Sequence, residues 1–316
     1  MEQGGITFRD ALLFCTLQVR PQPPTMVLRF VLQAGSFFPT SSFSFVSCAF
    51  FVLSLGVPLT IDLNADVGES FGAYSIGCDA ALMRSITSAS IAAGFHGGDP
   101  SVLRDTIRMA KAHGVAIGAH PGFPDLAGFG RREIRVTPRD AEDFVLYQVA
   151  AVAGVAAAEG ATLQHVKPHG ALYNMAARDA ALASAIARGV AAIDGSLILY
   201  GLPNSELLKA GRAAGLRVAA EGFADRAYEG DGSLTPRRNA GSIIDDPAVV
   251  VSRAVRLVKE HVVVAVDGTT RTLHVDTICI HGDTPGADEI AAKLRAGLEA
   301  AGVSVKPVGE TLKLGN

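Results

Sequence analysis

Histidine, lysine and acidic side chains follow a series of short apolar runs in this chain of 316 residues. Apolar residues that lead directly into polar ones are typical of a buried strand that ends in a loop. In parallel α/β folds the carboxyl ends of the strands meet on one face, where ligands gather. The residues in such positions are Asp62, Asn64, Asp66, Glu69, His96, His120, Lys167, His169, Glu221, Asp225, His281 and Asp283. Imidazoles and carboxylates grouped in this way suit acid–base catalysis, so we expect an active site.

Two chemistries are open for the histidines and the lysine. Asp62, His96 and His120 could bind a divalent metal, because two imidazoles and a carboxylate make a common hydrolytic site. Lys167 could instead steady a carboxylate or phosphate, with the histidine two residues later as a proton carrier. A structural alternative for Lys167 is an ion pair with Asp62 or Glu69.

Two loops carry arginines that could act on the same face. The segment 128–132 presents Arg131, which is suited to grip an anion, and a solvated turn is its alternative. The longer polar loop 225–237 begins at Asp225 and ends at Arg237. A long polar loop beside a strand end is typical of a lid, and contact with another protein chain is its alternative role.

The elements that must position these residues alternate between strands and helices from Leu59 onward, which is the βα signature. We expect strands near 60–64, 88–94, 115–120, 162–168, 196–201, 217–222 and 276–281. We expect helices near 79–87, 100–113, 138–159, 179–193, 204–214, 246–261 and 286–301, and a hairpin inserted over 262–275. Asp99 and Thr137, each followed by proline, mark two helix starts.

Seven βα units in series predict a TIM-like (β/α) barrel with seven strands, formed by a single domain over 59–316. A doubly wound open sheet is the alternative. No glycine-rich dinucleotide or phosphate-loop fingerprint follows the first expected strand, which weakens that alternative.

The composition fits one compact enzyme and excludes some partners. The net charge is −3 and the pI is about 6.2, so there is no basic footprint for nucleic acid. The four cysteines lie far apart and include no C-x-x-C pair. We therefore expect ordinary reduced thiols and a cytoplasmic location.

Residues 1–58 differ from the rest of the chain. The segment is rich in phenylalanine, and 36–58 carries no charged residue. An export signal or membrane anchor is one interpretation, but Pro39 interrupts the apolar run, and the uninterrupted piece 43–57 is too short to span a bilayer comfortably. We therefore expect an atypical N-terminal extension that is disordered or not translated, with no part in the site and no association with a membrane.

Six stretches of the sequence resemble the LamB/YcsF family. They are IDLNADVGESFGAY, IAAGFHGGDP, GVAIGAHPGFPDLAGFGRR, LQHVKPHGALYN, EGFADRAYEGDGSLTPR and DTICIHGDTPGA, and they follow the family order over about residues 59–305. The family pattern starts just before 60–64, which also sets the first 58 residues apart. The resemblance implies a (β/α) barrel similar to those of the polysaccharide deacetylase and glycoside hydrolase superfamily.

The resemblance also implies an activity, the ATP-dependent opening of 5-oxo-L-proline to L-glutamate. ATP with Mg²⁺ is the implied cofactor, and 5-oxoprolinase subunits B and C are the implied partners. The catalytic residues expected in this scheme are Asp62, Glu69, His96, His120, Lys167 and His169. The residues expected to bind substrate or phosphate are Asn64, Arg131, Asp225, Arg237, His281 and Asp283.

Within this scheme Lys167 and Arg131 hold anionic oxygens, the histidines move protons, and Asp62 and Glu69 orient water or a metal. A stand-alone metal-dependent hydrolase or deacetylase acting on a carbohydrate or amide stays open as the alternative. A non-enzymatic component that presents substrate to its partners is the third possibility.

Overall fold

The computed structural model describes residues 15–20, 25–32, 55–56, 59–284 and 286–312. The chain divides into two units, Met1–Pro58 and Leu59–Asn316. In the first unit, β1 (Cys15–Arg20) pairs antiparallel with β2 (Thr25–Leu32), which pairs antiparallel with β3 (Leu55–Gly56). The expectation that 1–58 is a disordered or untranslated extension falls mainly on residues outside the described ranges and stays a prediction.

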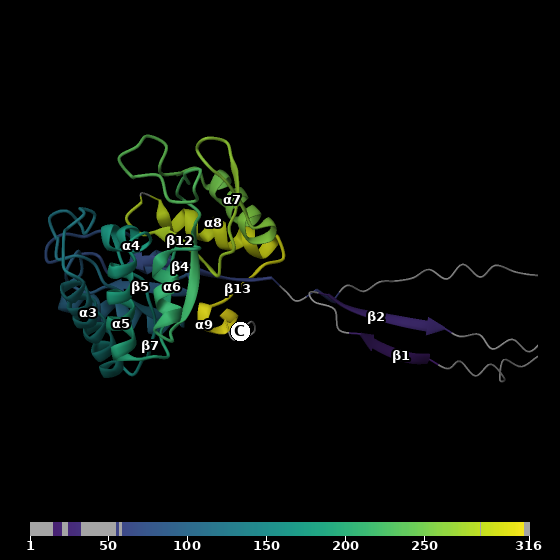
Figure 1. Cartoon of the computed structure of the whole chain (residues 1–316), viewed down its shortest axis with the longest axis horizontal. Coiled ribbons are helices and arrows are strands. Elements are labelled where there is room, and N and C mark those ends of the chain that lie inside the picture. Colours follow the sequence, from purple (N-terminus) through teal and green to yellow (C-terminus); the bar gives the residue numbers. More distant parts are fainter. Residues whose placement is uncertain (1–14, 21–24, 33–54, 57–58, 285, 313–316) are drawn as a thin grey trace, which may run out of the picture. The chain divides into compact units, whose positions relative to one another are not determined.

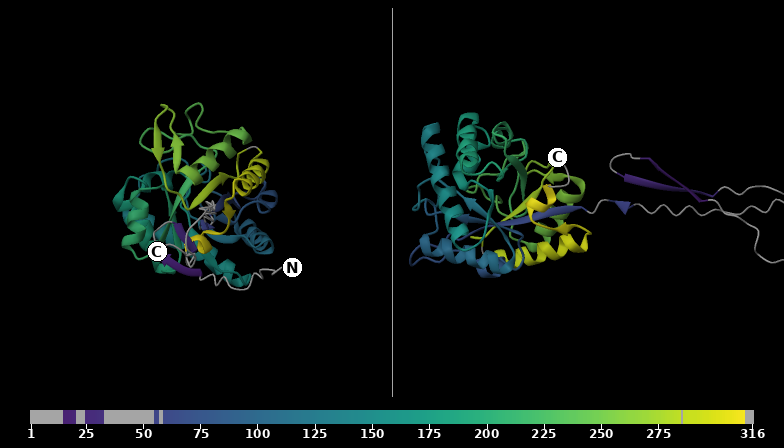
Figure 2. Two further views of the ribbon diagram at one scale, coloured as in Figure 1. Left: turned by 90° about the vertical axis from the view of Figure 1, so that its right-hand side faces the viewer. Right: turned by 90° about the horizontal axis from the view of Figure 1, so that it is seen from below.

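Seven parallel strands of the second unit close into a barrel (Figures 1 and 2). They are β4 (Thr60–Val67), β5 (Ser88–Ala92), β6 (Ala116–His120), β7 (Leu163–Val166), β8 (Ile198–Gly201), β9 (Arg217–Phe223) and β12 (Thr277–His281). Each strand pairs with the next, and β12 closes the barrel by pairing with β4 from Thr277 opposite Asp62 to His281 opposite Asp66. The predicted seven-stranded barrel is therefore confirmed, and the open-sheet alternative is wrong.

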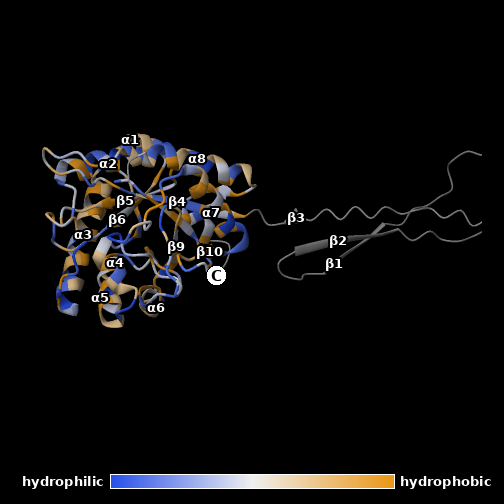
Figure 3. Ribbon diagram, turned by 90° about the horizontal axis from the view of Figure 1, so that it is seen from above, coloured by the Kyte–Doolittle hydropathy of each residue, from blue (hydrophilic) through white to orange (hydrophobic). Residues whose placement is uncertain are grey.

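Helices surround the barrel, and they carry both hydrophobic and hydrophilic residues along their length (Figure 3). They are α1 (Asp79–Leu82), α2 (Pro100–His113), α3 (Pro138–Ala158), α4 (Gly170–Ala176), α5 (Ala180–Ile193), α6 (Glu206–Ala213), α7 (Pro247–Glu260), α8 (Ala287–Ala300) and α9 (Val308–Thr311). Six expected helices lie within about two residues of their predicted bounds, but the one expected over 79–87 is only the single turn α1.

The two predicted helix starts are confirmed. The Asp99 side chain accepts hydrogen bonds from the backbone N–H groups of Ser101 and Val102 at the start of α2. Thr137 and Asp140 form a reciprocal capping box at the start of α3. Such caps satisfy backbone donors that have no partner inside the helix.

The end of the barrel at which the strands begin is covered by the C-terminal segment. A two-residue strand, β13 (Ser304–Val305), pairs with Thr60 and Ile61 at the start of β4. The helix α9 follows, and its Val308 is fully buried against Ile198 and Tyr200 of β8 and Ala219 of β9. An active site would therefore lie at the opposite end of the barrel, where the strands end.

The predicted inserted hairpin is confirmed. It consists of β10 (Val262–Val264) and β11 (Thr270–Thr272), which pair antiparallel around the Asp267-Gly268 turn. Gly268 adopts a φ of 83°, a conformation that glycine favours in such turns.

One helix among the described residues, α3, is long and apolar enough in length and composition to cross a membrane. It packs against α2, α5 and strand β6 of the barrel. This is the position of a covering helix in a (β/α) barrel, and the alanine-rich composition of α3 suits close packing there.

Candidate active site

Alternate residues of β4 face the barrel interior, because side chains of a strand alternate between its two faces. The lowest of them, Asp62, accepts hydrogen bonds from the hydroxyls of Thr87 and Ser88 at 2.7 Å each. It also accepts from Thr277 at 2.6 Å and from Tyr200 at 3.2 Å. Burial raises the pKa of Asp62, and the four hydroxyl donors oppose that shift. Asp62 therefore lies in a saturated structural network.

The position of Asp62 changes which residues could be ligands of a metal ion. The ligand atoms that converge with His96 and His120 come from Glu69 and His169, and Asp62 is not among them. The reason is the depth of Asp62 in the barrel, next to the strand starts, where hydroxyls from β5, β8 and β12 take both of its oxygens.

The next tier of the interior is organised around Lys167, which is 2% exposed. Its Nζ lies 2.7 Å from Asp66 Oδ1, 2.9 Å from Glu221 Oε1, 3.1 Å from Asn64 Oδ1 and 2.9 Å from Cys279 Sγ. An ammonium group has three donors, so these neighbours leave none for a ligand. The ion pair expected with Asp62 or Glu69 is instead made with Asp66 and Glu221.

The charges of this tier stabilise one another. Burial is the largest single effect and acts against the charged form of Lys167, but the neighbouring groups, with Asp66 first among them, together outweigh it and hold the pKa of Lys167 well above its ordinary value. Burial likewise acts to raise the pKa of Asp66, but His120 and Lys167 outweigh it and hold that pKa well below the ordinary value. Lys167 therefore fixes Asp66 as an anion beside the histidines.

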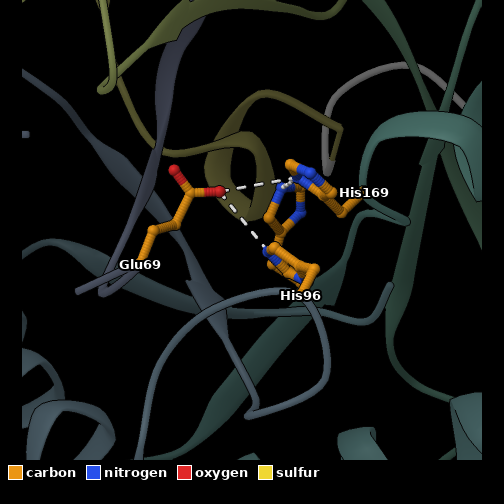
Figure 4. A group of neighbouring side chains, drawn as sticks. Glu69, His96 and His169 are labelled. Carbon is orange, nitrogen blue, oxygen red and sulfur yellow. Dashed lines mark hydrogen bonds and ion pairs between the residues drawn. The ribbon is translucent and has the colours of Figure 1, made fainter. Parts of the chain in front are cut away.

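Above this tier, three histidines and a glutamate converge, and Figure 4 shows Glu69 facing His96 and His169. Glu69 Oε1 lies 3.4 Å from His96 Nε2 and 3.5 Å from His169 Nδ1. His120 Nε2 lies 2.9 Å from His169 Nδ1 and 3.3 Å from Asp66 Oδ2. One ligand atom from each of the four lies within 4.8 Å of the others, and all four residues are buried, so the group could hold a divalent metal ion.

Burial sets the protonation of this group. It lowers the pKa of His96 and of His169 well below the ordinary value, and neighbouring histidines add to the shift. It raises the pKa of Glu69 well above the ordinary value, and repulsion from Asp66 adds to that shift. Burial therefore favours the neutral forms of Glu69, His96 and His169.

Glycines allow the backbone to approach the stacked rings of His96 and His169, whose centroids lie 3.8 Å apart. A Cβ at Gly122 would lie 2.5 Å from His96 Nδ1. A Cβ at Gly130, where φ is 61°, would lie 2.8 Å from both His96 Cβ and His169 Cδ2. Neither position has room for a side chain.

Another histidine, His281, lies near the same interior and is paired with the carboxylate of Asp225. His281 Nδ1 lies 2.9 Å from Asp225 Oδ2, and the His281 ring stacks on Phe223. Burial acts to raise the pKa of Asp225, but the contact with His281 outweighs it and lowers that pKa. One ligand atom each from His281, Asp66 and Cys279 lies within 4.8 Å of the others, so the pair borders the Lys167 tier.

Two predicted arginines meet at Asp283. Arg131 Nη2 lies 2.6 Å from Asp283 Oδ2, and Arg237 Nη1 lies 3.9 Å from the same oxygen. They line a cavity of about 470 Å³ together with Ile243, Asp245, Asp283 and Thr284. The predicted lid, 225–237, is tied to β9, where the Phe223 N–H donates to the buried Tyr228 hydroxyl, and to α7, where Arg253 donates to the Arg226 carbonyl. Its motion stays a prediction.

Two acids that the sequence places at strand ends, Asp66 and Glu221, were not assigned a role in the site, and neither was Cys279. Asp66 carried a usable signal, because it continues the two-residue spacing of Asp62 and Asn64 along one strand. Cys279 was expected to be an ordinary thiol; it is free and buried, and it contacts Lys167.

Residues 61–313 of the chain match the model of the LamB/YcsF family. Two relatives, each named as the A subunit of 5-oxoprolinase, come from Tolumonas auensis, at 56% identity, and Bordetella pertussis, at 54%. Each aligns over 246 residues, which are 78% of this chain and 98% of the relative. The crystal structure of the lactam utilization protein from Thermus thermophilus is 49% identical, with a TM-score of 0.74 over 78% of this chain and 99% of that one. With this extent of similarity, the chain belongs to the LamB/YcsF family.

Proposed function

We propose that this chain is the A subunit of an ATP-dependent 5-oxoprolinase, which cleaves 5-oxo-L-proline to L-glutamate while ATP is hydrolysed to ADP and phosphate. Subunits B and C are its proposed partners, and the cytoplasm is its proposed location. The observation that carries the proposal is the 54% identity to a relative named as the A subunit of 5-oxoprolinase, across 98% of that relative.

The reaction has a clear need for ATP. A five-membered lactam is a poor electrophile, and phosphorylation of its oxygen makes the ring carbon open to attack by water. Water then adds to that carbon, and the C–N bond breaks as the ring nitrogen gains a proton, which leaves an acyl phosphate. A second water cleaves this acyl phosphate to the side-chain carboxylate of glutamate and free phosphate. The barrel must therefore supply a group that accepts a proton from water and delivers one to nitrogen.

His281 is the group that we assign to this proton transfer. Asp225 binds Nδ1, which leaves Nε2 as the nitrogen that accepts and returns the proton. Asp225 is a positioning residue, because it acts through the histidine. This choice is supported by the contact of Asp225 with Nδ1 and by the neighbouring Asp66 and Cys279.

We expect the two arginines that contact Asp283 to bind anions. Arg131 and Arg237 line the 470 Å³ cavity, and a guanidinium group binds a carboxylate or phosphate in a bidentate manner. They would hold the carboxylate of 5-oxoproline or a phosphate. Lys167 does not take this role, since acceptors of the protein already surround its Nζ.

A stand-alone metal-dependent hydrolase acting on a carbohydrate or amide is the second candidate function. It is favoured by the convergence of Glu69 with His96, His120 and His169. Such an enzyme would use neither ATP nor partner subunits.

The test is glutamate release from 5-oxoproline by the purified full chain, with and without subunits B and C, and with and without ATP. We expect release only when all three proteins and ATP are present. Release by the chain alone without ATP would contradict the proposal and favour the second candidate. No release in the complete mixture, with all three proteins folded, would contradict it as well.

A further inference from the structure

The hydrogen bonds of two histidines fix which ring nitrogen carries a proton. His120 Nδ1 lies 2.7 Å from the carbonyl oxygen of Lys167, and His169 Nε2 lies 2.8 Å from that of Phe129. A carbonyl oxygen only accepts hydrogen bonds, so both of these nitrogens must donate. In the neutral rings the lone pairs therefore lie on His120 Nε2 and His169 Nδ1.

These two lone-pair nitrogens face each other at 2.9 Å. With no proton between them, the contact brings two acceptors together, which is unfavourable unless a cation lies beside both. Glu69 Oε1 and His96 Nε2 border the same point, and although both are buried, neither has a hydrogen-bond partner in the part of the chain that the structure describes. Buried polar atoms without partners are rare in folded proteins and call for an explanation such as an ion.

We propose that four side chains bind one divalent transition-metal ion: Glu69, His96, His120 and His169. Three imidazole nitrogens and one carboxylate oxygen are a donor set of Zn²⁺ and of its neighbours Co²⁺ and Ni²⁺. Mg²⁺ and Ca²⁺ take oxygen ligands instead, so this site differs in kind from that of the Mg²⁺ that accompanies ATP.

The surroundings of the cluster are those of a metal site. The carbonyl groups of Lys167 and Phe129 orient the rings of His120 and His169, as outer partners of ligating histidines do. His96 Nδ1 lies on the side of the ring that faces Gly122, so the opposite nitrogen, Nε2, is the one directed at Glu69. An ion held here would supply a Lewis acid.

The inference goes beyond the lactam reaction, because metal binding is measured without ATP, partners or substrate. A chain that binds no transition metal but supports glutamate release in the complete mixture would overturn the metal site and leave the proposed function standing. A bound ion together with no lactam cleavage in the complete mixture would support the metal site and contradict the proposed function.

The experiment starts from the full chain, purified and stripped of metal with a chelator. Zn²⁺ and Co²⁺ are titrated into it separately, the protein is separated from free ion, and elemental analysis gives the stoichiometry. We expect one ion per chain, and a visible absorption band with Co²⁺ that is typical of nitrogen ligation. Failure of the folded, metal-free chain to bind either ion would overturn the proposal.

Substitutions locate the ion. His120→Ala and His169→Ala should abolish stoichiometric binding, whereas His113→Ala, on the exposed surface of α2, should retain it. Circular dichroism checks that each variant is folded. Glu69→Gln keeps the size of the side chain and removes its charge, and should weaken Zn²⁺ binding by about tenfold or more. Wild-type stoichiometry in both histidine variants, or unchanged affinity in Glu69→Gln, would overturn the assignment.

Discussion

At the scale of single residues, Lys167 shows how a buried charge can serve a site without touching a ligand. Asp66 and Glu221 both lie within 2.9 Å of its ammonium group. Such a cluster persists only when every charge is paired, because desolvation of an unpaired ion costs several kcal/mol. The position next to His120 and His169 means that the field of this cluster acts directly on the histidines.

Lys167→Met removes the ammonium group but keeps most of the side-chain volume. Two buried carboxylates then lack a counter-charge, so we expect the free energy of unfolding to fall by about 3–5 kcal/mol. Urea denaturation measures the change. Lys209→Met, which removes an exposed partner of Glu206, is the matched control and should cost under about 1 kcal/mol. Equal, small losses in the two variants would contradict the arrangement around Lys167.

Asp225→Asn keeps the shape of the side chain and removes the charge that orients His281. We expect kcat of the complete three-subunit enzyme to fall by about 100-fold or more, because general acid–base catalysis contributes effects of this size. KM should change little, since Asp225 acts through the histidine. A fall in apparent kcat that matched the loss of folded protein, with KM unchanged, would point to a merely structural pair. Full retained activity would remove His281 from the chemistry.

At the scale of elements, β4 explains both the success and the limit of the sequence-based prediction. Its apolar-to-polar pattern predicted a strand at 60–64, but the strand continues to Val67. Asp66 was therefore placed in a loop, although it is the third inward-facing residue of the strand. The partners of Asp66 are His120 of β6 and Lys167 just after β7, both distant in sequence, so these contacts depend on how the barrel closes.

The strand-end histidines were predictable because each follows an apolar run, and the fold was predictable because seven such runs alternate with helices. The helix α4 was not predicted, since it has seven residues and its N-cap, His169, makes no side-chain cap. Nor could the sequence reveal that the Phe129 carbonyl accepts from His169, because backbone groups carry no sequence signature.

Gly122→Ala tests the loop that follows β6. A Cβ there would overlap His96, so we expect a loss of stability of about 1–3 kcal/mol, the usual cost of overpacking. Zn²⁺ affinity should fall as well, because His96 must move. Gly154→Ala is the same change at an exposed position of α3, where an added Cβ would meet no described atom within 4 Å. It should stabilise the chain by up to about 1 kcal/mol. Thermal unfolding and metal titration of both variants give the comparison.

At the scale of the whole barrel, the two ends have separate tasks. The C-terminal segment covers the end where the strands begin, through β13 and α9, and the charged cluster and histidines lie toward the other end. Stability and chemistry should therefore respond to different substitutions.

Val308→Ala removes two buried methyl groups from α9, and we expect it to lower the free energy of unfolding by about 2 kcal/mol. KM and kcat of the complete enzyme should stay unchanged at temperatures where the variant is folded. Val266→Ala, at an exposed position of the hairpin, should lie within about 0.5 kcal/mol of the parent chain. A large effect of Val308→Ala on KM would show that the two ends are coupled.

The strand β4 directs three polar side chains into the barrel interior: Asp62 into the hydroxyl network near the strand starts, and Asn64 and Asp66 into the tier around Lys167. A strand repeats every two residues, so inserting a single residue after Leu63 would turn the two upper side chains toward the helices. The chain should therefore tolerate many single substitutions in β4 better than any one-residue insertion or deletion there. The turn at Asp267-Gly268, by contrast, is exposed and should accept changes in length.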